Sequence, residues 1–142
     1  MSTESLRELA NGTELPAWEL PVTPTLVVST AIATRDFQDV HHDRDLAIER
    51  GSKDIFLNIL TTTGLVQRFV TDWVGPEALV RDIAIRLGAP AYPYDTLTFT
   101  GAVQEQVEVD GEQRCVVAVR GANSLGDHVT GTVTIALAGA GE

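Results

Sequence analysis

The segment from Ile55 to Trp73 limits the possible folds most, because it is the most apolar stretch that has the spacing of an α-helix. Its apolar positions at helical spacing are Ile59, Val66, Val70 and Trp73. Its first half is apolar nearly all round, which is typical of a helix at the centre of a protein. Ser52 or Asp54 can cap the start of this helix, and Gly75, followed by a proline, ends it. The sequence therefore predicts one long buried helix.

Four stretches after this helix alternate between apolar and polar residues or are β-branched, and each predicts a β-strand. They cover residues 79–88, 96–103, 115–120 and 129–137. Asp110 and Gly111 form a dipeptide that is typical of a tight hairpin turn. Long strands joined by tight turns make an antiparallel sheet, and a long apolar helix can cover the inner face of such a sheet. We therefore expect an α+β fold in which an antiparallel sheet wraps around a central helix.

The chain before this helix contains shorter elements. Prolines are frequent up to residue 24, so we assign residues 1–24 to an extended N-terminal arm. Residues 25–34 are rich in β-branched side chains and predict a strand. Asp43 can cap a short helix over residues 44–50, which Gly51 would end in a left-handed conformation. No repeat or linker divides the chain, so we expect a single domain over residues 1–142.

The acidic balance of the chain limits its partners. Its 142 residues include 10 basic and 20 acidic side chains, which gives a net charge of −10. Nucleic acids and anionic membranes need clustered lysine and arginine, so we expect neither as a partner. No run approaches the roughly 18 apolar residues of a membrane span, and the N-terminus lacks the apolar segment of a signal peptide. Cys115 is the single cysteine and lies in an apolar run, so we expect a core residue and a cytoplasmic protein.

Asp36 and His41 form the first candidate for chemistry. They lie five residues apart in a polar segment without a strong helix or strand pattern. A carboxylate beside an imidazole can hold a water molecule, with one group taking a proton and the other returning one. The alternative is that the two residues share a solvated loop by chance.

The start of the long helix, around Asn58 and Ile59, is the second candidate. Unpaired backbone N–H groups and the positive end of the helix dipole can stabilise an oxyanion there, although an ordinary capped helix start explains the same residues. A metal site is the third candidate, made of His41, His42, Asp43 and Asp45. No metal-binding motif is present, so we expect no metal and no other cofactor. We expect His128 to be a structural residue.

The run from Asp36 to Ala47, followed by a long helix and long strands, resembles the MaoC-like (R)-specific enoyl-CoA hydratases of the hot-dog fold. The family pattern is roughly D-x-N-P-[LIV]-H-x-D-x-x-x-A, and it is matched here at Asp36, Val40, His41, Asp43 and Ala47. The resemblance implies a single hot-dog domain that hydrates a 2-enoyl-CoA to a (3R)-3-hydroxyacyl-CoA. Coenzyme A would then be part of the substrate, Asp36 and His41 would bind the water, and Asn58 and Ile59 would face the thioester oxygen.

A narrower resemblance is to the small subunits of actinobacterial steroid side-chain hydratases. It rests on the segments T-R-D-F-Q-D-V-H-H-D-R-D, G-S-K-D-I-F-L-N-I-L, G-L-V-Q-R-F-V-T-D-W and T-F-T-G. It implies an acyl-CoA substrate with a bulky steroid side chain, a role in cholesterol catabolism, and a second MaoC-like hot-dog subunit in a heterotetramer. Four basic residues are unranked candidates for binding the nucleotide of coenzyme A: Lys53, Arg68, Arg81 and Arg86.

The sequence departs from the family pattern at two places. Gln38 and Asp39 replace the usual Asn-Pro, and Leu57 and Asn58 replace the usual His-Gly. A backbone N–H at residue 58 is present whatever the side chain, but the extra Cβ narrows the approach to it. These departures leave two alternatives open: a non-catalytic partner subunit that shapes the acyl tunnel, and a hot-dog acyl-CoA thioesterase.

Overall fold

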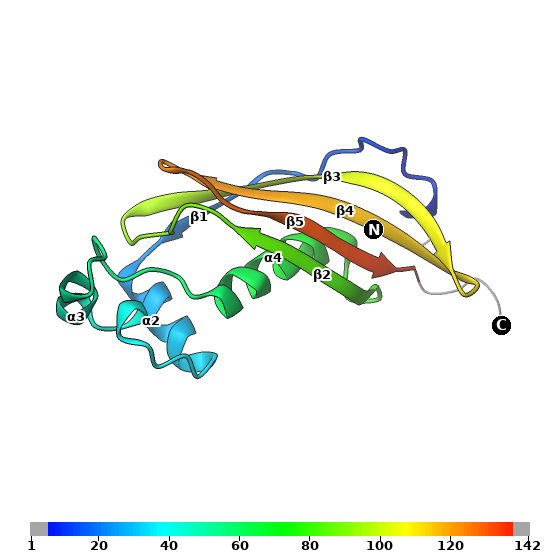
Figure 1. The fold of residues 1–142 in the computed structure, drawn as a ribbon. Helices are drawn as coiled ribbons and strands as arrows, with labels where there is room; N and C mark the ends of the chain where they lie inside the picture. Colours follow the sequence, from blue (N-terminus) through cyan, green and yellow to red (C-terminus); the bar gives the residue numbers. More distant parts are fainter. Residues whose placement is uncertain (1–5, 138–142) are drawn as a thin grey trace.

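The computed structural model describes residues 6–137, which form one antiparallel sheet with a long helix on its inner face (Figure 1). The five strands lie in the order β1-β3-β4-β5-β2. They are β1 (Trp18–Val22), β2 (Leu79–Leu87), β3 (Asp95–Val109), β4 (Glu112–Asn123) and β5 (Gly126–Ala136). The helices are α2 (Pro24–Ala33), the 3-10 turn η1 (Asp39–His41), α3 (Arg44–Glu49) and α4 (Ile59–Val74). The expected α+β class is confirmed.

The hydrophobic core lies between α4 and the curved sheet (Figure 1). From α4, the side chains of Val66 and Val70 are buried in it, as expected. Phe69 of α4 packs against Phe99 of β3, with ring centroids 5.9 Å apart. Gly101 of β3 permits this close approach, because a Cβ there would lie 3.0 Å from the Phe69 ring. The core thus fixes α4 across the inner face of the sheet.

The four predicted strands after α4 are confirmed as β2 to β5. Asp110 and Gly111 join β3 to β4 with φ values of 51° and 79°, as a two-residue hairpin turn with two left-handed positions requires. β2 pairs with β5 alone and forms one edge of the sheet. Gly131 lies opposite Ile85 in this pairing, and a Cβ on it would lie 2.1 Å from the carbonyl oxygen of Ala84. A side chain at residue 131 would therefore push β2 away from β5.

The strand predicted over residues 25–34 is wrong, because these residues form the helix α2. Thr23 caps the helix by accepting a hydrogen bond from Leu26 N, and Pro24 occupies the first turn, where its fixed φ suits a helix. The β-branched side chains favoured a strand, but this start signal and the tertiary packing of Val27 and Ala31 outweigh that weak preference.

The long helix begins four residues later than predicted. Ile55 and Leu57 are buried, as expected of an apolar helix, but their backbone lies outside any helix. The backbone N–H groups of this segment bond to distant carbonyls instead, Phe56 N to Val40 O and Leu57 N to Ala91 O. The cap is Asn58 and not Ser52 or Asp54.

Part of the predicted N-terminal arm is a strand of the sheet. β1 pairs with β3, and Leu20 lies opposite Leu97. Residues 1–5 of the arm lie outside the described part of the chain. Among the described residues, no helix combines the length and the apolar character needed to cross a membrane.

Candidate active site

Asp36 lies directly after α2, in a turn that ends the helix. Asp36 N donates to Ala31 O, and Arg35 N donates to Ile32 O, which is the bonding pattern of a left-handed helix end. Arg35 occupies the left-handed position with φ 56°, where glycine is the usual residue. This turn directs the chain away from α2 and brings the carboxylate of Asp36 to the start of α4.

His41 lies in η1 and is buried. Its Nδ1 is 2.8 Å from the carbonyl oxygen of Phe56. Because a carbonyl only accepts hydrogen bonds, this contact requires a proton on Nδ1, and the neutral ring therefore has an unprotonated Nε2. The Phe56 ring packs edge-on against the imidazole at 4.9 Å. The ring of His41 is thus held in one tautomer and one orientation.

The two side chains converge as the spacing suggested. His41 Nε2 lies 3.5 Å from Asp36 Oδ2, and the Asp36 side chain is 22% exposed. In the neutral tautomer both atoms are hydrogen-bond acceptors, so a donor with two hydrogens is needed to satisfy both. A water molecule placed between them would donate one hydrogen to each and keep its oxygen lone pairs free. The geometry suits the water-holding role that was expected of this pair.

Asn58 joins this pair to the start of α4. Its Oδ1 accepts from Thr61 N at 3.3 Å and from the Thr61 hydroxyl. Its Nδ2 donates to Thr34 Oγ1 at 2.8 Å and to Asp36 Oδ2 at 3.2 Å. The contact with Asp36 was not predicted, because the sequence pointed only to the backbone of Asn58. An asparagine before a helix signals a cap, but no sequence pattern links it to a residue 22 positions away.

The backbone at the start of α4 offers free hydrogen-bond donors. Among the hydrogen bonds of the described residues, none has Asn58 N or Ile59 N as its donor, and the first bond of the helix runs from Thr62 N to Asn58 O. Free N–H groups at the positive end of a helix suit a developing negative charge. The structure therefore places the predicted oxyanion-binding residues next to the predicted water-binding pair.

Of the other candidate residues, His42 and Asp43 have structural partners. His42 is exposed and its Nε2 lies 3.1 Å from Phe37 O, while Asp43 caps α3 through Leu46 N, as predicted. Asp45 is exposed. Over residues 6–137, no three side chains of the metal-ligating types come together.

His128 is buried in the core behind the site. Its Nδ1 donates to Ala89 O at 2.7 Å and its Nε2 accepts from the Thr62 hydroxyl at 2.8 Å. Burial holds the pKa of His128 below its ordinary value. The residue ties α4 to β5 and to the chain after β2, which is the structural role expected of it.

Two of the four candidate nucleotide-binding residues are paired with carboxylates. Arg68 lies 3.3 Å from Asp72 and packs over Trp18. Arg81 lies 2.7 Å from Glu112, and Arg81 together with a second arginine, Arg114, holds the pKa of Glu112 down at about 2.

Lys53 is linked to the site through aromatic rings. Its Nζ lies 5.8 Å from the centre of the Tyr92 ring. The Tyr92 ring in turn packs edge-on against Phe56, the residue that holds His41. A row of rings therefore runs from Lys53 to the imidazole.

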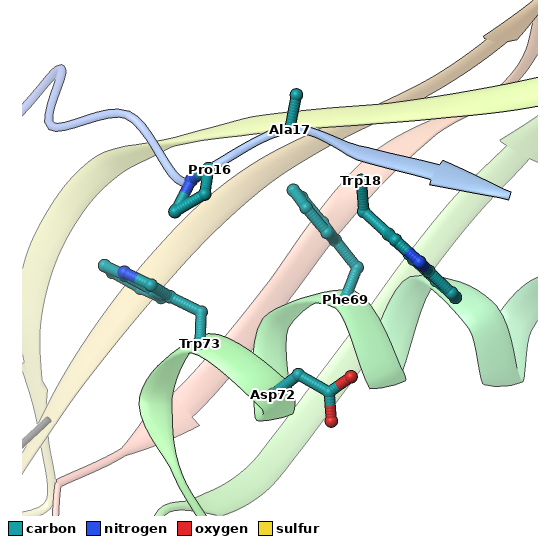
Figure 2. Close-up of a pocket in the computed structure, with 6 residues that line it drawn as sticks. All are labelled: Pro16, Ala17, Trp18, Phe69, Asp72 and Trp73. Carbon is teal, nitrogen blue, oxygen red and sulfur yellow. The ribbon is translucent and has the colours of Figure 1, made fainter.

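An apolar pocket lies at the other end of α4 (Figure 2). It has a volume of about 250 Å³, and it is lined by Pro16, Ala17, Trp18, Phe69, Asp72 and Trp73. The two tryptophans and Phe69 form its walls, and the carboxylate of Asp72 lies at one side (Figure 2). The pocket shares no residue with the site at the start of α4.

The profile of the MaoC-like domain matches residues 9–124 of the chain. The chain belongs to the MaoC-like domain family. One MaoC-like relative is the 3-oxo-4,17-pregnadiene-20-carboxyl-CoA hydratase beta subunit of Mycobacterium tuberculosis. It is 58% identical over 126 residues, which cover 89% of this chain and 95% of the relative. This finding confirms the resemblance to a subunit of a steroid side-chain hydratase.

Solved structures confirm the hot-dog fold. The ChsH1-ChsH2 complex from Mycobacterium tuberculosis contains a chain with a TM-score of 0.83 and 58% identity, over 90% of this chain and 98% of that one. The unliganded R-hydratase PhaJ1 from Pseudomonas aeruginosa has a TM-score of 0.79 at 21% identity, over 91% of this chain and 82% of that one. At that identity the second likeness shows the fold alone.

Proposed function

We propose that this chain is the catalytic subunit of a heteromeric hydratase that adds water to the 2-enoyl-CoA thioester of a steroid side chain. The product would be a (3R)-3-hydroxyacyl-CoA. One observation carries the proposal: His41 Nε2 and Asp36 Oδ2 face each other at 3.5 Å, next to free N–H groups at the start of α4. The beta subunit of the mycobacterial hydratase, 58% identical, supports the choice of substrate class. A coenzyme A substrate fits a cytoplasmic enzyme.

The mechanism follows from the positions of these groups. Asp36 and His41 hold a water molecule whose oxygen attacks the β-carbon of the enoyl thioester. Negative charge then develops on the thioester oxygen, where the N–H groups of Asn58 and Ile59 stabilise it. The pair takes one proton from the water and delivers one proton to the α-carbon. The protonation state of Asp36 and His41 is therefore the same before and after the reaction. Coenzyme A belongs to the substrate in this mechanism, and Asp36 and His41 handle the protons, so the proposed reaction calls for no cofactor.

The surface around the site supports a second subunit. Large apolar side chains next to the site are exposed, including Phe37 at 66% and Ile59 at 51%. Exposed apolar groups that cluster in this way mark interaction surfaces. The similar mycobacterial complex has two components, ChsH1 and ChsH2. We propose that a second MaoC-like hot-dog chain covers these residues and encloses the acyl-CoA.

The test uses the assembled complex and the loss of absorbance of the 2-enoyl thioester. Asp36→Asn and His41→Ala should each lower kcat by orders of magnitude while the complex still assembles. His42→Ala is the matched control, because His42 is the neighbouring exposed histidine without contact to Asp36, and it should retain activity. Full turnover in both site variants would contradict the proposal.

A non-catalytic role is the second candidate, because Gln38 and Asp39 depart from the family pattern. Asp39 accepts a hydrogen bond from Arg50 Nε at 2.8 Å, so it serves the local structure of η1 and α3. Mutating the corresponding acidic and histidine pair on each subunit separately decides between the two roles. Release of free coenzyme A thiol would instead indicate a thioesterase.

A further inference from the structure

We propose that the side chain of Asn58 is a positioning residue that fixes the carboxylate of Asp36 against His41. This inference rests on the proposed function, since it takes Asp36 as part of the water-binding pair. The family pattern has glycine at this position. Glycine has no side chain, so the inference assigns a role to a group that the pattern lacks.

The hydrogen bonds of the Asn58 side chain determine its orientation. Thr61 N is a donor, so the oxygen of the amide must face Thr61 and the nitrogen must face Thr34 and Asp36. Both hydrogens of the amide and its oxygen are then used. The residue is 2% exposed, so water cannot easily replace any of these bonds. The amide is therefore a fixed donor aimed at Asp36 Oδ2.

The carboxylate of Asp36 is held at both oxygens. Oδ1 accepts from Gln38 N at 3.3 Å, and Oδ2 accepts from Asn58 Nδ2 at 3.2 Å. Oδ2 is also the oxygen that faces His41 Nε2. Without the amide, Oδ2 would lose its donor within the described part of the chain, and the bond to Gln38 alone would let the carboxylate rotate about its Cβ–Cγ bond. Asn58 thus decides which oxygen is presented to the bound water.

The same side chain also caps α4. Through Oδ1 it fixes the first turn of the helix, and through Nδ2 it fixes Asp36. The free N–H groups at the helix start and the water-binding carboxylate are therefore held relative to each other by one residue. Misplacement of reacting groups by about 1 Å can cost about a hundredfold in rate, so this alignment matters for turnover.

The experiment compares Asn58→Ser with the unchanged chain in the assembled hydratase. Serine keeps a side-chain oxygen that can cap α4 but has no amide donor for Asp36. We expect kcat to fall about 10- to 100-fold with KM nearly unchanged, when activity is measured well below the thermal midpoint. The midpoint itself should fall, because Thr34 and Asp36 lose a buried donor. Asp43→Ser is the matched control, because Asp43 caps α3 in the same way without touching Asp36; it should keep full kcat.

Two further variants separate positioning from a structural role. Asn58→Asp keeps the cap but places a second carboxylate against Asp36, so kcat should fall further than with serine. In the Asp36→Asn background, Asn58→Ser should cause no additional loss, because the group that it positions is already changed. An equal further loss in that background, full kcat in Asn58→Ser, or failure of both Asn58 variants to fold would overturn the inference. If Asp36→Asn alone keeps full activity, Asp36 is not part of the water-binding pair and the inference fails with that premise; full activity of His41→Ala as well would show that the proposed function is wrong.

Discussion

The buried polar side chains of the described chain gather at the first turns of α4. They are His41, Asn58, Thr61, Thr62 and His128. Each has a hydrogen-bond partner, as burial of a polar group requires. The core elsewhere is apolar, so the start of α4, where the candidate site lies, is the polar part of the interior. The two buried histidines differ, because His41 faces a carboxylate and His128 faces a hydroxyl and a carbonyl.

His128 makes the stability of the protein depend on pH. Burial lowers its pKa in the folded state, whereas in the unfolded chain the pKa is about 6.5. Below that value the unfolded chain binds a proton that the folded chain does not, so the free energy of unfolding falls as pH falls. Above it, the contribution is fully present. The loss is at most about 1.4 kcal/mol per pH unit.

Denaturant unfolding between pH 7.5 and pH 5.5 measures this effect. We expect the unchanged protein to lose more unfolding free energy over this range than a His128→Asn variant, which has no imidazole to protonate. Other titrating groups contribute equally to both proteins and cancel in the difference. If the free energy of unfolding fell equally with pH in both proteins, His128 would not be the source of the pH dependence.

At the scale of the elements, structure followed prediction where the periodicity of the sequence was strong. Alternation along residues 79–88 predicted β2, and the Asp110-Gly111 dipeptide predicted the hairpin between β3 and β4. Prediction failed for α2, because its β-branched side chains favour a strand, whereas the Thr23 cap and Pro24 in the first turn start a helix. Apolar character alone could not show that residues 55–57 are extended, since their backbone bonds are made to distant segments.

The sequence predicted one part of the candidate site and missed another. The spacing of Asp36 and His41 suggested a pair, and the structure brings their side chains together; their catalytic roles stay predictions. The contact between Asn58 and Asp36 could not be predicted, because it depends on how the end of α2 meets the start of α4. Local sequence carries no information about such a meeting of two elements.

Two glycines should respond in opposite ways to alanine. Gly131→Ala places a Cβ 2.1 Å from Ala84 O, so it should separate β2 from β5 and cost about 3 kcal/mol. Gly64→Ala is the matched control on an exposed face of α4, with nothing within 4 Å of the new Cβ, and it should stabilise by up to about 1 kcal/mol. Denaturant unfolding measures both. Equal changes in the free energy of unfolding for the two variants would contradict the claim that β2 leaves no room for a side chain at residue 131.

At the scale of the molecule, the sheet has two edges, β1 and β2, and the site has an apolar border. The chain has a net charge of −10, and like charge opposes the association of identical copies. The exposed apolar side chains beside the site favour contact with another protein. Both features agree with the proposed second subunit.

Phe37 tests this assembly. Its side chain is 66% exposed, so Phe37→Ser should change the free energy of unfolding of the isolated chain by less than about 0.5 kcal/mol. If the second subunit covers Phe37, the same change should weaken assembly at least about tenfold, because a buried aromatic anchor contributes strongly to binding. Titration of the two subunits in analytical ultracentrifugation measures the affinity. Unchanged affinity would place the interface elsewhere.

The position of Asp36 between two helix ends has a further consequence. Helix ends open locally at a smaller cost in free energy than the core of a sheet unfolds. The end of α2 and the start of α4 meet where Asn58 bonds to Thr34 and Asp36, so the opening of either end would disrupt the proposed water site while the sheet stays intact. Heat would then stop turnover before it melts the protein, and the upper working temperature of the enzyme would be set by this local opening and not by global unfolding.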